Sequence, residues 1–458
     1  MRCDRSVGRV TEKRTPSPFE DPRSFPHASG LVGTILKGAT LIDLEPASVE
    51  RADLRIDGSH ITARAPELEP QEGDEVIDLS GHLVMPGLVS AHHRLTQSFA
   101  RGLDRPFERA PLEDALDPDS TEWAAAAGAL EALSAGTTTV IDRHASTGFV
   151  MGSLGRVARG VDRVGLRAAL AWDVTDRAGE DVREDALVET VAFHHQHAGH
   201  RRFRAVLGAA ALHELSDEAL EGLAQAAAAI GVPLSVTLAE TPDEGRLCAQ
   251  RFGEGPVTRL LAVEGLLRQT TLVAHAVHLS WPELSQVISS GAWLVHTPSA
   301  DAERGEGHAP AGKFGPRAAL GTAGYGADLF AEARLARQRA LDAGQPVAVL
   351  RMLANGHRIA SELFGETIGP LSEGAVADLL VLDYRPQTPL TAQTLEAHLA
   401  HGFGARHVLS AMVDGAWRLW ERRPVAVSPE LLAEGAAASA YAVWSRISQA
   451  IAAREGAG

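Results

Sequence analysis

Histidine, arginine and carboxylate side chains recur at one kind of position in this sequence, just after short apolar runs with the composition of buried strands. Imidazoles and carboxylates serve as metal ligands and general bases, and arginines bind anions through paired hydrogen bonds. One such residue alone is usually a satisfied hydrogen-bonding group, but the density of the set favours a ligand-facing cavity. The set comprises His92, His93, Arg94, Arg143, His144, Asp173, Asp176, Glu240, His275, His278, His296 and the segment 322–324.

These side chains need a scaffold that gathers strand ends. Between residues 85 and 365, short apolar runs alternate with Ala-rich amphipathic segments such as 121–134, 217–230 and 281–290, which is typical of parallel βα units. Eight repeats, without a Gly-x-Gly-x-x-Gly motif after a strand, favour a closed (β/α)8 barrel whose site lies at the carboxyl ends of the strands. The predicted strands are 83–92, 137–144, 167–174, 204–212, 233–240, 270–278, 292–297 and 318–322.

The two ends of the chain carry β-rich runs instead. Neither segment, 31–84 or 366–427, has enough β-rich runs to complete a sandwich alone. We therefore predict one small composite β-sandwich domain built from both segments. Residues 1–30 are predicted to form a flexible N-terminal arm, 85–365 the TIM barrel, and 428–458 an Ala-rich C-terminal helix. The predicted fold class is therefore α/β.

Composition limits the partners. The formal charge is −16 over 458 residues and no basic patch is visible, which argues against nucleic acid and anionic membranes. No run reaches the roughly 18 apolar residues of a membrane span. Cys3 and Cys248 are the only cysteines and form no disulfide framework, so we expect a cytoplasmic protein whose partner is a small molecule or another protein.

Several ordered motifs resemble the amidohydrolase superfamily. Val84–Leu103, VMPGLVSAHHRLTQSFARGL, is similar to its opening motif, in which Pro-Gly-Leu-Val leads to Ala-His-x-His on the first barrel strand. VAHAVHLSWPEL, LVHTP, LGTAGYGADLF and GPLSEGAVADLLVLDYRPQTPLT follow in the same order, and the resemblance spans about residues 31–424. IDRHAS and DVTDRAGE are similar to the SsnA-like aminohydrolase or chlorohydrolase branch. The resemblance implies an amidohydrolase-type barrel, hydrolysis or deamination of non-peptide C–N bonds, and a homo-oligomer.

The resemblance also implies one divalent metal, bound by His-x-His on strand one, a His on strand five, a His on strand six and an Asp on strand eight. Of these five positions, His92 and His275 are retained, whereas Arg94, Thr237 and Ala323 replace the other three. The strand-five motif His-x-His-x-x-Glu reads Ser-Val-Thr-Leu-Ala-Glu over 235–240, so its carboxylate, implied to move protons, remains as Glu240. The substrate-side histidine implied on strand four is Ala210.

Arginine cannot ligate a metal, because its guanidinium stays protonated and only donates. We therefore expect no cofactor or, if a metal binds, a single Zn or Fe near His92 and His275. Our hypothesis is that the Arg94 guanidinium takes the metal's place, pairs with Glu240 and bonds to one of these histidines. Arg143 and Arg94 could bind an anionic ligand, or be neutralised by Asp142, Asp173, Asp176 or Glu240. The candidate catalytic residues are Glu240, His278, Arg94, Arg143 and His144.

Three functions fit these residues. The first is a metal-free pseudoenzyme, kept for ligand binding or assembly. The second is an active hydrolase or deaminase of small cyclic amides, purines or related heterocycles that uses a rearranged or metal-free site, and the third is lyase or isomerase chemistry on an acidic substrate. The segments 103–123 and 300–315 differ from the family's usual ones, so the cavity is expected to be more open, or filled by its own side chains.

Overall fold

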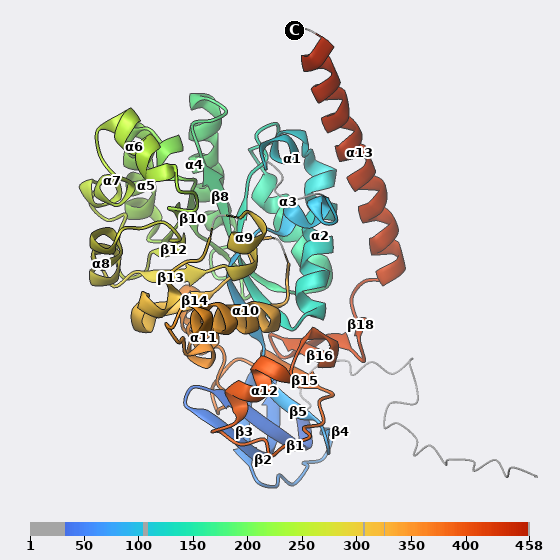
Figure 1. The fold of residues 1–458 in the computed structure, drawn as a ribbon. Helices are drawn as coiled ribbons and strands as arrows, with labels where there is room; N and C mark the ends of the chain where they lie inside the picture. Colours follow the sequence, from blue (N-terminus) through green and yellow to red (C-terminus); the bar gives the residue numbers. More distant parts are fainter. Residues whose placement is uncertain (1–32, 104–108, 306, 325, 457–458) are drawn as a thin grey trace, which may run out of the picture.

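The computed structural model describes residues 33–103, 109–305, 307–324 and 326–456. Parallel strands form a barrel in the upper part of Figure 1, with helices around it. The prediction of a (β/α)8 barrel is confirmed, and β9 (Phe203–Ala205) adds a short pairing to β8. In order around the barrel the strands are β6 (Leu88–His93), β7 (Thr137–His144), β8 (Arg167–Val174), β10 (Leu207–Ala209), β11 (Leu234–Leu238), β12 (Leu272–His275), β13 (Trp293–His296) and β14 (Ala318–Leu320).

The barrel closes where the segment after β14 meets β6. The amides of Thr322 and Ala323 donate to the carbonyl of His92 at 2.9 and 3.1 Å. Gly321 permits this approach, because a Cβ atom there would lie 2.8 Å from the same oxygen. Small and branched apolar side chains, among them Ala91 and Ile141, fill the barrel interior. The closure therefore brings the polar residues at the end of β6 next to the segment that follows β14.

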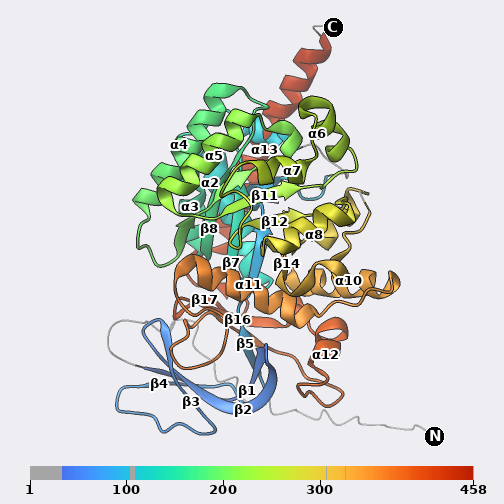
Figure 2. The same ribbon diagram turned by 90° about the vertical axis from the view of Figure 1, so that its left-hand side faces the viewer.

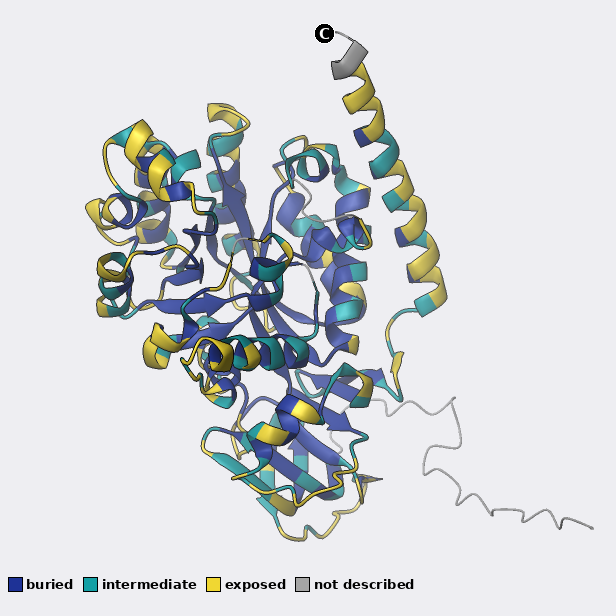
Figure 3. Cartoon of the chain, viewed as in Figure 1, coloured by how far each residue is buried: buried dark blue, intermediate teal, exposed yellow. Residues whose placement is uncertain are grey.

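Helices cover the outside of the barrel, and their buried faces appear dark blue in Figure 3. Sequence signals set their ends: the Asp117 side chain caps α2, and α5 begins after Ser216 and ends at Gly231, whose φ is +68°. The short helices after β6 are η1 (Leu95–Ala100) and α1 (Ala110–Ala115). The others are α2 (Pro118–Ser134), α3 (Ser153–Val164), α4 (Glu180–Gln196), α5 (Asp217–Ile230), α6 (Glu244–Phe252), α7 (Pro256–Ala262), α8 (Trp281–Ser289), α9 (Pro298–Glu303), α10 (Leu329–Asp342) and α11 (Val349–Phe364).

Both chain ends contribute to a second sheet below the barrel (Figure 2). The first strands join the last through β5, which pairs with β1 on one side and antiparallel with β15 on the other, so the predicted composite β-domain is confirmed. Arg167 of the barrel and Asp378 beside β15 form an ion pair in which both side chains are fully buried. The strands are β1 (Thr34–Leu44), β2 (Ala47–Asp57), β3 (His60–Ala65), β4 (Glu75–Asp78), β5 (Leu83–Pro86), β15 (Leu379–Leu382), β16 (Val408–Val413), β17 (Ala416–Trp420) and β18 (Arg423–Pro424), and α12 (Leu395–His401) lies between β15 and β16.

The chain ends in α13 (Pro429–Gly456), which runs along α2 and past α1 (Figure 1). The Trp444 indole donates to the carbonyl of Phe99 at 2.7 Å, while Tyr441 points outward with 78% of its surface exposed. Among the described residues, no helix is long and apolar enough to cross a membrane. The predicted arm at 1–30 lies outside the described residues.

Candidate active site at the barrel mouth

Two arginines share one carboxylate at the carboxyl ends of β6, β7 and β8. Arg94 donates to Asp173 Oδ2 at 2.8 Å, and Arg143 donates to Asp173 Oδ1. Arg143 also donates to the Thr237 hydroxyl at 2.9 Å and to the carbonyl of Ala209. Burial by itself would raise the pKa of Asp173, but the two guanidiniums outweigh it and hold that pKa at about 2. We call Arg94, Arg143 and Asp173 the inner clasp.

The inner clasp corrects one part of our hypothesis. Arg94 pairs with Asp173 and not with Glu240. Within the described part of the chain, both ring nitrogens of His92 lack a hydrogen-bond partner, as does Nε2 of His275. Asp173 was among the carboxylates expected to neutralise the two arginines, and that alternative is confirmed. Arg94 and Arg143 therefore share Asp173 as their counter-ion, and their charges are not open to a ligand.

A second pair of arginines holds Glu240, which follows β11. Arg109, just before α1, lies 3.3 Å from Glu240 Oε1, and Arg304, just after α9, lies 3.4 Å from the same atom. Burial would raise the pKa of Glu240, but the guanidiniums of Arg109 and Arg304 hold it well below its usual range. We call Arg109, Arg304 and Glu240 the outer clasp. The two altered segments therefore reach into the site, which agrees with the expectation of a cavity filled by its own side chains.

His275 links the outer clasp to a buried carboxylate that the sequence reasoning missed. Its Nδ1 lies 2.9 Å from Asp301 Oδ1 on α9, and its Nε2 lies 3.8 Å from Glu240 Oε1. Asp301 comes only five residues after His296 at the end of β13, and a polar residue so soon after a strand was the signal available. His275 has a φ of +71°, a conformation that is costly for a residue with a side chain, and Ala276 beside it has a φ of +53°.

The other predicted residues lie around this centre. Burial and Arg94 lower the pKa of His144 to about 3, and its Nε2 contacts the Ser146 hydroxyl at 2.9 Å. His278 is exposed and has no side-chain contact with either clasp among the described residues. Asp176 binds Arg183 at 2.9 Å, outside the site. Arg94, Arg143, Glu240 and His275 thus come together as expected, whereas His278 and Asp176 do not.

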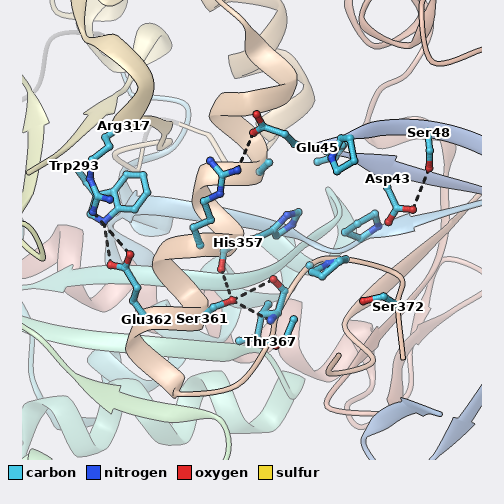
Figure 4. A pocket seen from close by; sticks show the side chains of 18 of the residues that line it. Asp43, Glu45, Ser48, Trp293, Arg317, His357, Ser361, Glu362, Thr367 and Ser372 are labelled. Carbon is cyan, nitrogen blue, oxygen red and sulfur yellow. Dashed lines mark hydrogen bonds and ion pairs between the residues drawn. The ribbon is translucent and has the colours of Figure 1, made fainter. Parts of the chain in front are cut away.

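A cavity of about 450 Å³ opens at the barrel mouth, and neither His92 nor His275 lines it. Its walls are Arg109, Ala110, Glu113, Ala145, Asp173, Thr175, Arg177, Ala210, Glu214 and Arg304. A larger cavity of about 650 Å³ lies elsewhere, between the β-domain and the opposite end of the barrel, where Figure 4 shows Trp293 and Arg317 across from Asp43 and Glu45. No predicted site residue lines the larger cavity. The mouth cavity therefore borders both clasps, and a smaller cavity of about 150 Å³ borders His296 and Asp301.

Comparisons with known proteins agree with the fold and the motifs. The sequence profile of the Amidohydrolase family matches residues 83–418, so the chain belongs to that family. A 5-methylthioadenosine/S-adenosylhomocysteine deaminase of Moorella thermoacetica is 30% identical over 75% of this chain and 83% of its own length. A similar deaminase of Thermococcus sibiricus is 26% identical over 83% of this chain and 92% of its own length.

Solved structures show the same fold at lower identity. A zinc-bound adenosine deaminase of Xanthomonas campestris has a TM-score of 0.79 at 20% identity, covering 91% of this chain and 99% of that one. The zinc complex of the atrazine chlorohydrolase TrzN from Arthrobacter aurescens has a TM-score of 0.77 at 22% identity, covering 89% of this chain and 100% of its own.

The described residues do not match the donor set that such a metal needs. Catalytic zinc sites use about three protein ligands of His, Glu, Asp or Cys type. Among the described residues, no group of three or more such side chains could hold a metal ion. His92 and His275 face each other with ring centroids 5.4 Å apart, but the nearby carboxylate Asp173 is already bonded to two arginines.

Proposed function

We propose that this protein is a hydrolase or deaminase that acts on a non-peptide C–N bond of a small heterocyclic compound, with a histidine as general base in place of a metal-bound water. The family and the deaminase relatives support the reaction class. The observation that carries the metal-free form is the Asp301, His275 and Glu240 arrangement at 2.9 and 3.8 Å.

The geometry assigns these side chains distinct roles. Asp301 accepts a hydrogen bond from His275 Nδ1, which fixes the tautomer and leaves the lone pair of Nε2 facing Glu240. Nε2 takes a proton from an attacking water, whose oxygen bonds to the ring carbon, and the same proton then goes to the departing amine. Glu240 orients the water, and Arg109 and Arg304 hold the Glu240 carboxylate in place and ionised.

A second candidate is ligand binding without turnover, as in a pseudoenzyme. The mouth cavity is walled by Asp173 and Arg304, and His275 is only 1% exposed. Nε2 of His275 is buried, so water reaches it only if neighbouring side chains move. A rigid pair of clasps would bind a ligand at the mouth and leave it unchanged.

One assay separates the two candidates. Adenosine, 5-methylthioadenosine, guanine and atraton are incubated with the protein, with and without a chelator, and ammonia and products are measured. We expect turnover that the chelator does not reduce and that His275→Gln lowers by about 10²-fold or more, the usual contribution of a general base. His195→Gln, an exposed histidine on α4, is the matched control. Binding of a compound by calorimetry without any product would select the second candidate, and activity that disappears with the chelator would overturn the metal-free site.

A further inference from the structure

The charged groups at the inner end of the mouth cavity are unequal in number. Each clasp has two guanidiniums around one carboxylate. Each clasp therefore has an excess of one positive charge, because guanidiniums stay protonated and the pKa values of both carboxyls are depressed. Two further carboxylates reduce the combined excess. Asp142 adds less than a full negative charge at neutral pH, since burial raises its pKa to about 7, and Asp301 contributes its charge from the far side of His275.

The carboxylates at the rim offset this excess only in part. Arg109 is the strongest charged neighbour of Glu113, but burial raises the pKa of Glu113 and so weakens its negative charge. Glu113 lies 3.2 Å from Arg177, and Asp114 lies 3.1 Å from the same side chain. Glu214 accepts a hydrogen bond from the Thr175 hydroxyl at 2.9 Å. A positive excess therefore remains at the inner wall, and the rim carboxylates Glu113 and Glu214 reduce it without removing it.

Arg304 is the least satisfied of the four arginines. Its side chain is 19% exposed, and its one partner among the described residues is Glu240, which it reaches through Nε and shares with Arg109. The two terminal nitrogens of Arg304 make no bond to the described residues. A cation removed from water without full pairing is costly, and an anion in reach of its free donors relieves that cost.

Arg109 and Arg304 both line the mouth cavity, whereas the inner clasp exposes only Asp173 to it. We propose that the substrate or ligand of this site carries an anionic group, a carboxylate or phosphate, which binds between Arg109 and Arg304 while the heterocycle fills the cavity toward Ala210. This inference names the substrate class and rests on the proposed function only for the heterocycle. The sequence left an anionic ligand as one of two alternatives for Arg94 and Arg143, and the proposal assigns that ligand to the outer clasp instead.

Calorimetry on the full chain tests the proposal with three probes: adenosine, adenosine 5′-monophosphate and inorganic phosphate. We expect the monophosphate to bind at least about tenfold more tightly than adenosine at low salt, as one added charge-assisted contact provides, and the ratio to shrink as salt screens it. Phosphate alone should bind more weakly than the monophosphate. Equal affinity for adenosine and its monophosphate would overturn the anion site, and phosphate binding as tightly as the monophosphate would overturn the heterocyclic part.

Two substitutions place the anion. Arg304→Gln should abolish the preference for the monophosphate with little change in adenosine affinity, and Glu240→Gln should strengthen monophosphate binding because it removes the competing carboxylate. Arg246→Gln, on an exposed arginine that pairs with Asp243, is the matched control. An unchanged preference in Arg304→Gln, or weaker binding in Glu240→Gln, would refute the placement. These are binding measurements, so absence of turnover would count against the proposed hydrolase and leave this test intact.

Discussion

Replacing Asp173 by asparagine would leave Arg94 and Arg143 without the one carboxylate that both contact. The two arginines are only 2% and 1% exposed, so neither can turn to water without repacking the barrel mouth. Removing one partner of a buried ion pair costs about 3–5 kcal/mol, because the remaining charge stays desolvated. We therefore expect Asp173→Asn to lower the free energy of unfolding by that amount.

The pKa of Asp173 gives an independent magnitude. Its pKa is about 2 in the folded chain against an ordinary 3.8, and at 1.36 kcal/mol per pKa unit the difference is about 2–3 kcal/mol. Because the folded pKa is depressed, this stability is present above about pH 4 and is lost as the pH falls through about 2. The substitution should cost somewhat more than this, since it also removes hydrogen bonds from two guanidiniums.

Thermal unfolding measures the effect. An unfolding entropy of about 2.1 cal/mol/K per residue over 458 residues gives about 1 kcal/mol/K, so 3–5 kcal/mol lowers Tm by about 3–5 °C. Asp119→Asn is the control, because Asp119 is 84% exposed where it pairs with Arg156 and should shift Tm by less than about 1 °C. An unchanged Tm in Asp173→Asn, together with the wild-type loss of stability below pH 4, would show that Asp173 does not stabilise the fold through Arg94 and Arg143.

Four other outcomes follow from the structure. Restoring the lost ligands in the triple variant R94H/T237H/A323D should yield about one zinc per chain by plasma mass spectrometry, against far less for the native chain; an equal content in both would contradict the donor count. Arg167→Met should lose about 3–5 kcal/mol in urea unfolding, because Asp378 is then buried without its cation, and a loss below about 1 kcal/mol would argue against that role. Burial raises the pKa of Glu332 to about 8 in the folded chain. Between about pH 4.5 and 8 only the unfolded chain releases this proton, so the free energy of unfolding falls as the pH rises through that interval. Urea titrations at pH 5 and 8 should show that Glu332→Gln reduces this fall by at least about 1 kcal/mol. Light scattering should report more than one chain per particle, because the resemblance to the family implies a homo-oligomer; a monomer would contradict that prediction.

Strand positions were largely predictable because buried parallel strands are short apolar runs of fixed direction. The predicted runs 137–144 and 167–174 coincide with β7 and β8, and 217–230 coincides with α5. Predictions failed at the ends of strands near the site, where 270–278 became β12 of only four residues. There the backbone turns through positive φ at His275 and Ala276, and periodicity carries no information about such turns.

Most members of the site that lie at strand ends were predictable, but their pairing was not. Which strands end in Arg94, Arg143 and Glu240 follows from the sequence, because every barrel strand delivers its last residues to one rim. Which carboxylate each arginine contacts depends on side-chain reach across the barrel, and Asp173 lies between the two arginines. Arg109 and Arg304 come from connecting segments, whose course periodicity does not predict.

Fixed arginines alter how this barrel responds to conditions. A site built on histidine and carboxylate ligands loses its metal in acid, when the imidazoles protonate, and in chelators. Four guanidiniums keep their charge across the whole physiological range, and they hold Asp173 and Glu240 ionised well below it. Sulfate keeps its charge between pH 5 and 9, so it is the suitable probe of this difference. Its affinity for the outer clasp should fall only modestly across that interval, as Asp142 ionises near pH 7, and should not respond to a chelator, with salt as its main antagonist. A steep loss of sulfate affinity around pH 6 to 7 would mean that a titrating histidine, and not the outer clasp, supplies the positive charge.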